Sequence, residues 1–259
     1  MSDRTILYTT DNALDPSIAA LCQRLLLREA DGLPIVSVSQ RPIEFGRNVC
    51  VGEIGRSWYS LYTQLLAGVA AIETDWVVMA EHDCLYSREH LAYVPADPAV
   101  FWYNANCWLV QWGDTRPHLA PLSGMYSYWP RRVALSQLIC HRSLLESATR
   151  DVMRLLDMGL RVEQGLRWHG EPGVVSEVFR KAYLNASSGR PIQLQKDLEH
   201  YVEGYASKFF RTSTPNLDIR HGGNWSGPRR GKMRRYELPY WGRFAALWEE
   251  GSNGHHRDS

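Results

Sequence analysis

The sequence has no apolar run long enough to cross a membrane. Its longest nearly uninterrupted apolar stretches, Leu65 to Ile72 and Trp76 to Ala80, fall far short of the roughly 20 residues with which a helix spans a bilayer. The first residues lead directly into the strand-like Ile6-Leu7-Tyr8, with no apolar signal region before them. We therefore expect no membrane partner and a cytoplasmic location.

Cysteine pairs and phosphate-binding glycine motifs are also missing. The five cysteines are widely spaced and include no C-x-x-C pair, which argues against a disulfide framework or a structural zinc site. Neither G-x-x-x-x-G-K-[ST] nor G-x-G-x-x-G occurs, which disfavours kinases and dinucleotide-binding enzymes. Lysine plus arginine total 29 against 28 aspartate plus glutamate, so a nucleic acid would have to be bound by a local basic patch.

The chain does have enough apolar residues to form a sizeable core. Its 259 residues are 44% hydrophobic and include 10 Trp and 13 Tyr, a composition that excludes disorder as the main state. No segment repeats, and only residues 251–259 have the polar composition of a disordered tail. We expect a single domain over residues 1–250, with halves of about 1–100 and 101–250.

Periodicity predicts alternating strands and helices in the first half. Asp15-Pro16 supplies a helix N-cap and a first-turn proline, and apolar residues at helical spacing continue to about Glu29. A second apolar helix face runs from Trp58 to Val69. The predicted strands lie at residues 4–10, 33–38 and 75–80, with one brief strand at 48–51. This alternation is typical of an α/β fold with a mainly parallel central sheet flanked by helices.

The second half of the chain differs from the first in its amino-acid composition. From Val100 to Arg132 the chain is rich in aromatic residues and interrupted by prolines, and we expect antiparallel strands and loops added to the parallel half. A strand at 135–140 should lead into a helix at about 143–158, and a further helix is expected at 173–183.

Polar residues follow three of the predicted strands directly. Because ligands of open α/β sheets bind at the carboxyl ends of the strands, these residues are the first candidates for a site. They are Thr9, Thr10, Asp11 and Asn12 after the first strand, Glu81, His82 and Asp83 after the 75–80 strand, and His221 with the residues Gly222 to Asn224 after the Leu217 to Ile219 run.

Glu81 and Asp83 form an E-x-D motif at the end of a buried strand. A turn there can aim both carboxylates to one side, which suits a hard divalent cation such as Mg²⁺ or Mn²⁺ with its waters and phosphate oxygens. Such a metal cancels negative charge on a leaving phosphate. The alternative is a strand end capped by two solvated acids, which is the more common meaning of an isolated E-x-D.

In this region the sequence resembles the nucleotide-sugar glycosyltransferases with the GT-A fold, of the family 2 type. The resemblance covers roughly residues 4–185 in organisation and is closest over Gly55 to Leu85. In that family a buried strand ends in D-x-D, and Glu81-His82-Asp83 would be that motif with Glu in place of the first Asp. The resemblance implies that Asp83 binds metal, that Glu81 touches either metal or sugar, and that Asp11 and Asn12 hold the nucleoside. It implies a donor half before residue 100 and an acceptor half after it.

Four further residues are candidates for the same site. Many members of the family recruit a late histidine to the metal, and His221 precedes two glycines, which allow close backbone approach to phosphates. Arg56 begins the second helix, where a cation and free amides suit a diphosphate. Glu171 or Glu177 occupies the segment that carries the general base of inverting enzymes. Each also has a plain structural explanation, and a retaining enzyme would need no such base.

A basic stretch follows His221. Residues 220–235 contain six arginines and lysines and no acid, interleaved with aromatic rings, a combination that suits a nucleic-acid backbone and its bases. Donor-diphosphate binding or an ordinary solvated face would also explain these cations. The candidates for acceptor or nucleic-acid contact are Trp102, Trp129, Trp225, Arg229, Arg230, Lys232, Arg234 and Arg235.

The sequence supports one leading hypothesis and three alternatives. The leading one is a metal-dependent glycosyltransferase that uses a nucleotide sugar, UDP-linked in the first instance, and a hydroxyl acceptor. A 5-hydroxymethylpyrimidine in DNA, everted into an aromatic pocket as in some phage enzymes, is the first acceptor considered. A glycan or small-molecule acceptor, a sugar nucleotidylyltransferase and a non-enzymatic nucleic-acid-binding module are the alternatives. We expect no obligate protein partner.

Overall fold

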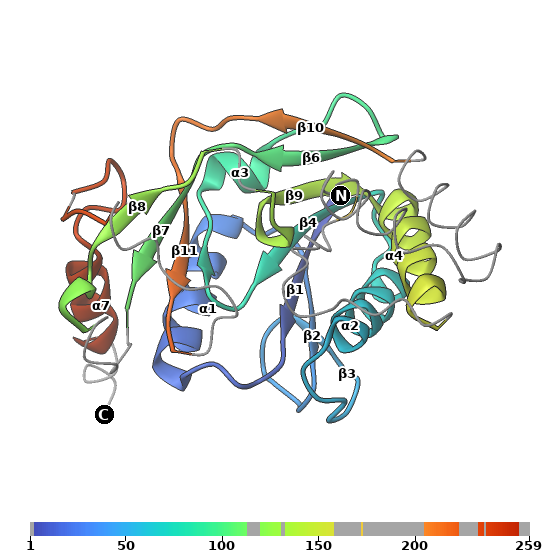
Figure 1. The fold of residues 1–259 in the computed structure, drawn as a ribbon, viewed down its shortest axis with the longest axis horizontal. Helices are drawn as coiled ribbons and strands as arrows, with labels where there is room; N and C mark the ends of the chain where they lie inside the picture. The colour runs from blue at the N-terminus through green and yellow to red at the C-terminus, as the bar shows by residue number, and fades with distance from the viewer. Residues whose placement is uncertain are drawn as a thin grey trace, which may run out of the picture.

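The computed structural model describes residues 3–112, 120–130, 133–157, 172, 205–222, 233–235 and 237–253. The described residues form two β-sheets and the helices that cover them (Figure 1). Within this part of the chain, every helix is too short or too polar to cross a membrane.

The larger sheet is mainly parallel. Its strand order is β10-β6-β9-β4-β1-β2-β3. Strand β9 pairs antiparallel with both of its neighbours, and every other pairing in the sheet is parallel. The strands are β1 (Arg4–Thr10), β2 (Ile35–Ser39), β3 (Arg47–Cys50), β4 (Trp76–Glu81), β6 (Val100–Asn104), β9 (Leu138–His141) and β10 (Ala206–Phe210).

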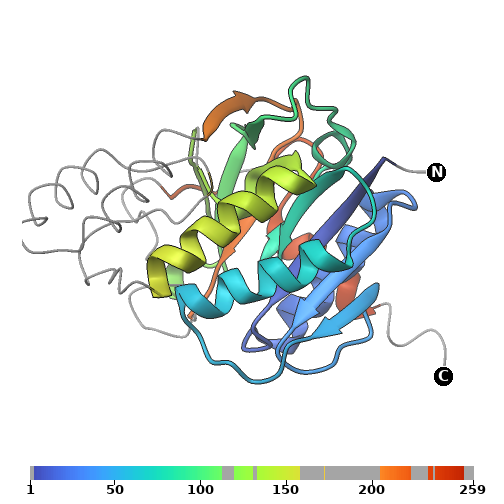
Figure 2. The same ribbon diagram turned by 90° about the vertical axis from the view of Figure 1, so that its right-hand side faces the viewer.

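Helices cover both faces of this sheet. Helices α2 (Trp58–Ala71) and α4 (Arg142–Asp157) lie side by side on one face (Figure 2), where Leu65 and Leu145 pack against strand residues such as Met79. The opposite face packs against α1 (Pro16–Ala30) and α3 (Arg88–Ala92) through a second apolar cluster that includes Leu26 and Leu91. Central strands buried on both sides explain the continuous apolar run of β4.

The smaller sheet also packs against α1. Its strands are β5 (Cys84–Leu85), β7 (Cys107–Gln111), β8 (Tyr126–Tyr128) and β11 (Asn216–Arg220), in the order β5-β11-β7-β8. One face of this sheet meets α1 and α7 (Phe244–Asn253) in a third apolar cluster, to which Leu21, Ile219 and Phe244 belong. Helix α1 therefore contributes apolar residues to the clusters of both sheets.

The helix starts follow from local hydrogen bonding. The Asp15 carboxylate accepts a hydrogen bond from the Ser17 amide at 2.9 Å, and Pro16 occupies the first helical position of α1. The Ser57 hydroxyl accepts one from the Ser60 amide at 3.0 Å at the start of α2. Both caps satisfy amides that a helix leaves without an internal partner.

The α/β fold with a mainly parallel sheet is confirmed, and the second half departs from expectation in three places. The segment from Val100 was predicted to add antiparallel strands; β6 and β7 do pair antiparallel with β9 and β8, but β6 also pairs parallel with β10 in the large sheet, and β7 also pairs parallel with β11. The strand expected at 135–140 opens with a 3₁₀ turn, η2 (Leu135–Gln137), before β9. A second 3₁₀ turn, η1 (Ala120–Leu122), precedes β8. The helix expected at 173–183 lies outside the described residues.

A glycine sets the distance between α2 and the sheet. A Cβ atom added at Gly68 would lie 2.3 Å from Leu7 Cδ1 and 3.0 Å from Val38 Cγ2, and both of those residues are fully buried or nearly so. Gly68→Val should therefore overpack this contact and lower the free energy of unfolding by about 2 kcal/mol. Urea denaturation measures the change. Ala70→Val, on the exposed side of the same helix, is the control and should change stability little; equal effects of the two substitutions would contradict the packing argument.

Candidate functional site

The ends of three strands meet at one place in the fold. Strands β1 and β4 are parallel neighbours, so the residues that follow them share one edge of the large sheet. The small sheet is joined to that edge because the Ile219 amide donates to the Asp83 carbonyl at 2.8 Å. His221, the first residue after β11, is thereby brought to the turn after β4.

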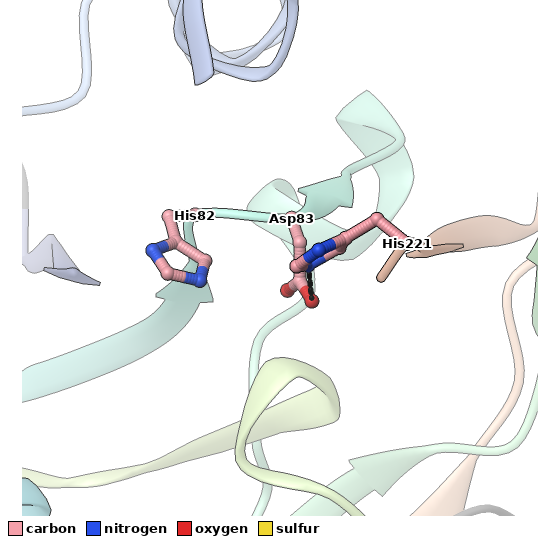
Figure 3. A group of neighbouring side chains, drawn as sticks. All are labelled: His82, Asp83 and His221. Carbon is pink, nitrogen blue, oxygen red and sulfur yellow. Dashed lines mark ion pairs between the residues drawn. The ribbon is translucent and has the colours of Figure 1, made fainter. Parts of the chain in front are cut away.

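His82, Asp83 and His221 form a cluster at this junction (Figure 3). Each offers one ligand atom, and these atoms all lie within 4.8 Å of one another. The His221 Nε2 atom is 3.5 Å from Asp83 Oδ2. The side chains of Asp83 and His221 are 13% and 10% exposed, and that of His82 is 14% exposed. Glu81, Asp83 and Cys84 form a second, overlapping group.

Asp83 is a buried carboxylate that stays charged. Burial by itself would raise its pKa, but the hydrogen bond from His221 and the electrostatic interactions with His82, Arg220 and His221 hold the pKa well below the usual range of an aspartate. Because a buried charge is tolerated only with compensating partners, the site is built to keep one negative charge among cationic or metal-binding groups.

His82 is held neutral and oriented. Burial lowers its pKa, despite the opposing effect of the Asp83 and Asp11 carboxylates. The Thr10 hydroxyl lies 2.8 Å from Nδ1 of His82, and Asp11 Oδ1 lies 3.7 Å from the same nitrogen. With Nδ1 engaged by Thr10, Nε2 is the nitrogen suited to coordinate a metal, and hydrogen-bonded partners of this kind fix the ring of a ligating histidine.

Asp11 connects this cluster to the start of α2. Its Oδ2 atom lies 3.2 Å from Nε of Arg56, whose side chain is 44% exposed. Arg56 immediately precedes Ser57, the N-cap of α2. The ion pair places an exposed guanidinium next to the amides of a helix start, an arrangement that attracts anionic groups.

Three predicted donor-binding residues lie at the same strand ends. Asn12 is engaged by a neighbouring loop, since its Oδ1 accepts hydrogen bonds from the Gln40 and Arg41 amides at 2.8 and 2.9 Å and its Nδ2 donates to the Arg41 carbonyl at 3.2 Å. Its side chain therefore positions that loop. Thr9 is buried in β1, and Glu81 ends β4, where its amide donates to the Tyr86 hydroxyl at 2.8 Å.

The cluster has the donor chemistry of a divalent-metal site. It combines two imidazoles with one ionised carboxylate, and neutral imidazole is the form that coordinates a metal. The nearby Thr10 contact supplies the outer-sphere support that such sites have. Imidazole ligands suit Mn²⁺ and other transition metals better than Mg²⁺, which prefers oxygen, so the residues present fit Mn²⁺ more closely than Mg²⁺.

The aromatic candidates for acceptor contact divide into two. Trp102 is 8% exposed and packs in the apolar cluster beneath the sheet, with its Nε1 donating to the Asp97 carbonyl at 3.1 Å. It is a core residue, and the expectation that it lines an acceptor pocket is corrected. Trp129 is half-buried, and the Arg220 guanidinium lies 5.9 Å from its ring centroid.

The basic stretch is less uniform than its sequence indicates. Arg220 was counted in it, but this residue is 4% exposed and its Nε lies 2.9 Å from Asp218 Oδ1. Polar and apolar residues alternate in Asn216–Arg220 (NLDIR), which places Asp218 and Arg220 on the same face of a strand. This alternation is the sequence signal that could have indicated the ion pair. Arg234 and Arg235 are exposed. The remaining predicted residues, Glu171, Glu177, Trp225, Arg229, Arg230 and Lys232, lie outside the described part of the chain.

Two members of the site were not assigned these positions from the sequence. His82 was predicted to bind the donor, not to join the metal ligands, and Thr10 was named only as part of the segment after the first strand, without a role of its own. The middle residue of an E-x-D motif usually points away from the two acids in an extended strand, but the turn that follows β4 brings His82 back beside Asp83.

No protein-family model and no curated protein matches the chain. Among solved structures, a glycosyltransferase involved in the glycosylation of the major capsid of PBCV-1 is similar at 11% identity and a TM-score of 0.40, over 96% of this chain and 98% of that chain. The apo form of the glycosyltransferase GlyE from Streptococcus pneumoniae TIGR4 is similar at 12% identity and a TM-score of 0.44, over 96% of this chain and 60% of that chain. The mannosyltransferase PcManGT from Pyrobaculum calidifontis, in complex with GDP-Man and Mn²⁺, is similar at 14% identity and a TM-score of 0.37, over 89% and 58%.

This chain spans less than two thirds of the length of the GlyE and PcManGT chains. These solved structures are glycosyltransferases, but at TM-scores below 0.5 the likeness carries no argument about the activity or ligands of this chain. Its function therefore has to be argued from its own residues.

The donor set predicts tighter binding of Mn²⁺ than of Mg²⁺, as measured by isothermal titration calorimetry on the purified protein. Asp83→Asn should abolish Mn²⁺ binding because it removes the charged ligand. Thr10→Val should weaken it roughly tenfold to a hundredfold, as loss of outer-sphere support does in metal sites. The control is His141→Ala, because His141 lies opposite Trp76 at the other end of β4. If His141→Ala weakened Mn²⁺ binding as much as Asp83→Asn does, the assignment of the metal ligands would be contradicted.

Proposed function

We propose that the protein is a metal-dependent glycosyltransferase that moves a sugar from a nucleoside diphosphate sugar to a hydroxyl group. The observation that carries this proposal is the cluster of His82, Asp83 and His221 at the carboxyl end of β4. The potential metal-ligand atoms of these three side chains lie within 4.8 Å of one another. In open α/β sheets this edge is where ligands bind. The sequence resemblance at Glu81-His82-Asp83 points to the same chemistry.

Each described residue has a distinct task in this proposal. Asp83, His82 and His221 would hold a Mn²⁺ ion, which when bound neutralises negative charge on the diphosphate leaving group. Arg56 would contact the diphosphate at the start of α2. Asp11 orients Arg56 through the ion pair at 3.2 Å and accompanies His82, and Asn12 fixes the adjacent loop. Glu81 would either accept hydrogen bonds from hydroxyls of the sugar or ribose, or contact the metal.

The step at the acceptor remains a prediction from the sequence. Inverting transfer needs a general base within hydrogen-bond reach of the acceptor hydroxyl, and Glu171 and Glu177 are the candidates for that base. The base would take the acceptor proton while the oxygen attacks the anomeric carbon and the nucleoside diphosphate departs. UDP-sugars are the first donors to test.

As the acceptor we propose a 5-hydroxymethylpyrimidine in DNA. Support comes from the exposed side chains of Arg234 and Arg235, since exposed cations bind phosphate backbones without sequence preference. Arg234 is tied to the small sheet by backbone hydrogen bonds with Tyr126 at 2.7 and 2.8 Å, which places the segment beside β8. A glycan or small-molecule hydroxyl is the alternative acceptor.

Thermal denaturation in the presence of nucleotide sugars tests the proposed donor reaction. A panel of UDP-, GDP- and dTDP-linked sugars, each with and without Mn²⁺, should contain one that raises the Tm in a metal-dependent way, because a ligand that binds only the folded state stabilises it by mass action. Asp83→Asn should remove that shift. Asp97→Asn, in the turn before β6, is the control and should keep it. A panel without any metal-dependent shift would argue for the non-enzymatic binding module.

Band shifts with duplex DNA over a salt series test the proposed acceptor. The wild-type protein should bind at low salt and lose affinity as salt rises. Replacing both Arg234 and Arg235 with alanine should reduce the slope of log K against log salt by about 2, roughly one per phosphate contact. Arg24→Ala, at an exposed position of α1, should leave the slope unchanged. Failure of the wild-type protein to bind at low salt would end the DNA hypothesis and leave the glycan alternative.

A further inference from the structure

The loop between β3 and α2 carries Arg56, and its backbone conformation depends on two glycines. Gly52 and Gly55 have φ angles of 80° and 74°, in the left-handed region that glycine enters without steric cost. A Cβ atom added at either position would meet nothing within 4 Å, so packing at these two positions does little to fix the loop. Arg56 follows Gly55 directly and is exposed. Hydrogen bonds from other segments are therefore needed to define where Arg56 lies.

Gln40, the residue after β2, makes two hydrogen bonds to this loop. Its Nε2 atom donates to the Gly55 carbonyl at 2.6 Å, and its Oε1 atom accepts from the Gly55 amide at 3.1 Å. One carboxamide thus binds both backbone groups of the residue before Arg56. Gln40 is 7% exposed, so water competes little for these contacts. The pair of contacts needs a donor and an acceptor at the end of a long neutral side chain, which glutamine provides.

The backbone of Gln40 is itself held from two sides. Asn12 accepts hydrogen bonds from the Gln40 and Arg41 amides through its Oδ1 atom. It does so with a φ angle of 59°, a left-handed conformation that asparagine tolerates better than most residues. On the other side, the Cys50 thiol at the end of β3 donates to the Gln40 carbonyl at 3.6 Å. The ends of β1, β2 and β3 are therefore joined at Gln40, and the Gln40 side chain joins them to Gly55.

The ion pair between Arg56 and Asp11 is too exposed to fix the guanidinium by itself. The Arg56 side chain is 44% exposed, and ion pairs in contact with water contribute little to stability. Asp11 follows β1, whereas Arg56 belongs to the loop that Gln40 binds, so the 3.2 Å contact requires the loop and the end of β1 to keep their relative positions. A guanidinium that is already in place loses less conformational entropy when it binds an anion.

We propose that Gln40 is a positioning residue, which holds Gly55 and thereby fixes Arg56 in the orientation that binds the diphosphate of the donor. The inference rests on the proposed glycosyl transfer and adds to it a residue that acts only through another one. Gln40 does not touch the nucleotide in this account. Its loss should therefore weaken diphosphate binding when Arg56 is present and have almost no effect when Arg56 is absent.

A double-mutant cycle tests this, with the affinities for UDP and for inorganic pyrophosphate measured by isothermal titration calorimetry in the presence of Mn²⁺. Arg56→Ala should weaken binding roughly tenfold to a hundredfold, because it removes charge-assisted hydrogen bonds to the diphosphate. Gln40→Met keeps the length of the side chain, removes its polar atoms and should weaken binding about tenfold. In the Arg56→Ala background, Gln40→Met should change the affinity by less than about twofold, because residues that act through one another are not additive.

Two further variants complete the cycle. Gln23→Met is the matched control, because it makes the same chemical change on α1, where Gln23 Nε2 donates to the Tyr8 hydroxyl at 3.4 Å; it should leave the affinity for UDP unchanged. Gln40→Asn keeps a carboxamide but is one methylene too short to bind both groups of Gly55. It should give the same pattern as Gln40→Met and takes its place if Gln40→Met does not fold.

A second measurement needs no nucleotide. In protein labelled with ¹⁵N at arginine, each Nε–H group gives its own NMR signal, and the signal lost in Arg56→Lys belongs to Arg56. Its heteronuclear NOE reports motion on the picosecond to nanosecond timescale. In the wild type this NOE should exceed that of the exposed Arg24, and in Gln40→Met it should fall to the value of Arg24. Gln23→Met should leave it unchanged.

Three results would overturn the positioning role. The first is an equal loss of affinity on Gln40→Met with and without Arg56, which would mean that Gln40 acts independently of Arg56. The second is an unchanged affinity in Arg56→Ala. The third is an Arg56 NOE that is the same in the wild type and in Gln40→Met. If the wild-type protein binds neither UDP nor pyrophosphate, the diphosphate contact fails together with the proposed function, and the NOE still decides whether Gln40 orders Arg56.

Discussion

The buried negative charge of Asp83 is the constraint around which the strand ends are arranged. An ionised carboxylate at 13% side-chain exposure is tolerated only where positive or metal-binding groups surround it. The chain supplies these groups from segments far apart in sequence: His82 from the same turn, and His221 with Arg220 from the end of β11. Removing any of them leaves the carboxylate less compensated, so the chemistry of the site depends on this arrangement.

Much of the first half of the fold could be predicted from the sequence because its signals are local. The Asp15-Pro16 start of α1, the apolar face of α2 and the buried run of β4 appear in the structure where periodicity indicated them. The strand-end rule also predicts that Asp11, Asp83 and His221 lie close together. In the structure Asp11 contacts His82, and His221 contacts Asp83. That rule works because parallel strands present their carboxyl ends at one edge.

The second half depended on pairings that no local pattern encodes. Whether β6 joins the large sheet, and whether β7 pairs with β8 alone or also with β11, is decided by contacts across more than a hundred residues of sequence. Arg220 is a second example. In the sequence it belongs to a run of basic residues and is expected at the surface, whereas in the structure it is buried in an ion pair with Asp218. Trp102 was misjudged for a related reason, because an aromatic residue in a strand suits a core and a binding surface equally.

The central claim is that His82 and His221 bind one divalent ion together with Asp83, and electron spin echo spectroscopy of bound Mn²⁺ measures this directly. In protein labelled with ¹⁵N at histidine, the account predicts echo modulation from two imidazole nitrogens, reduced to one in His82→Ala or His221→Ala. Bound Mn²⁺ without nitrogen modulation, or with modulation unaffected by either substitution, would contradict it, because the ion would then lie elsewhere in the molecule.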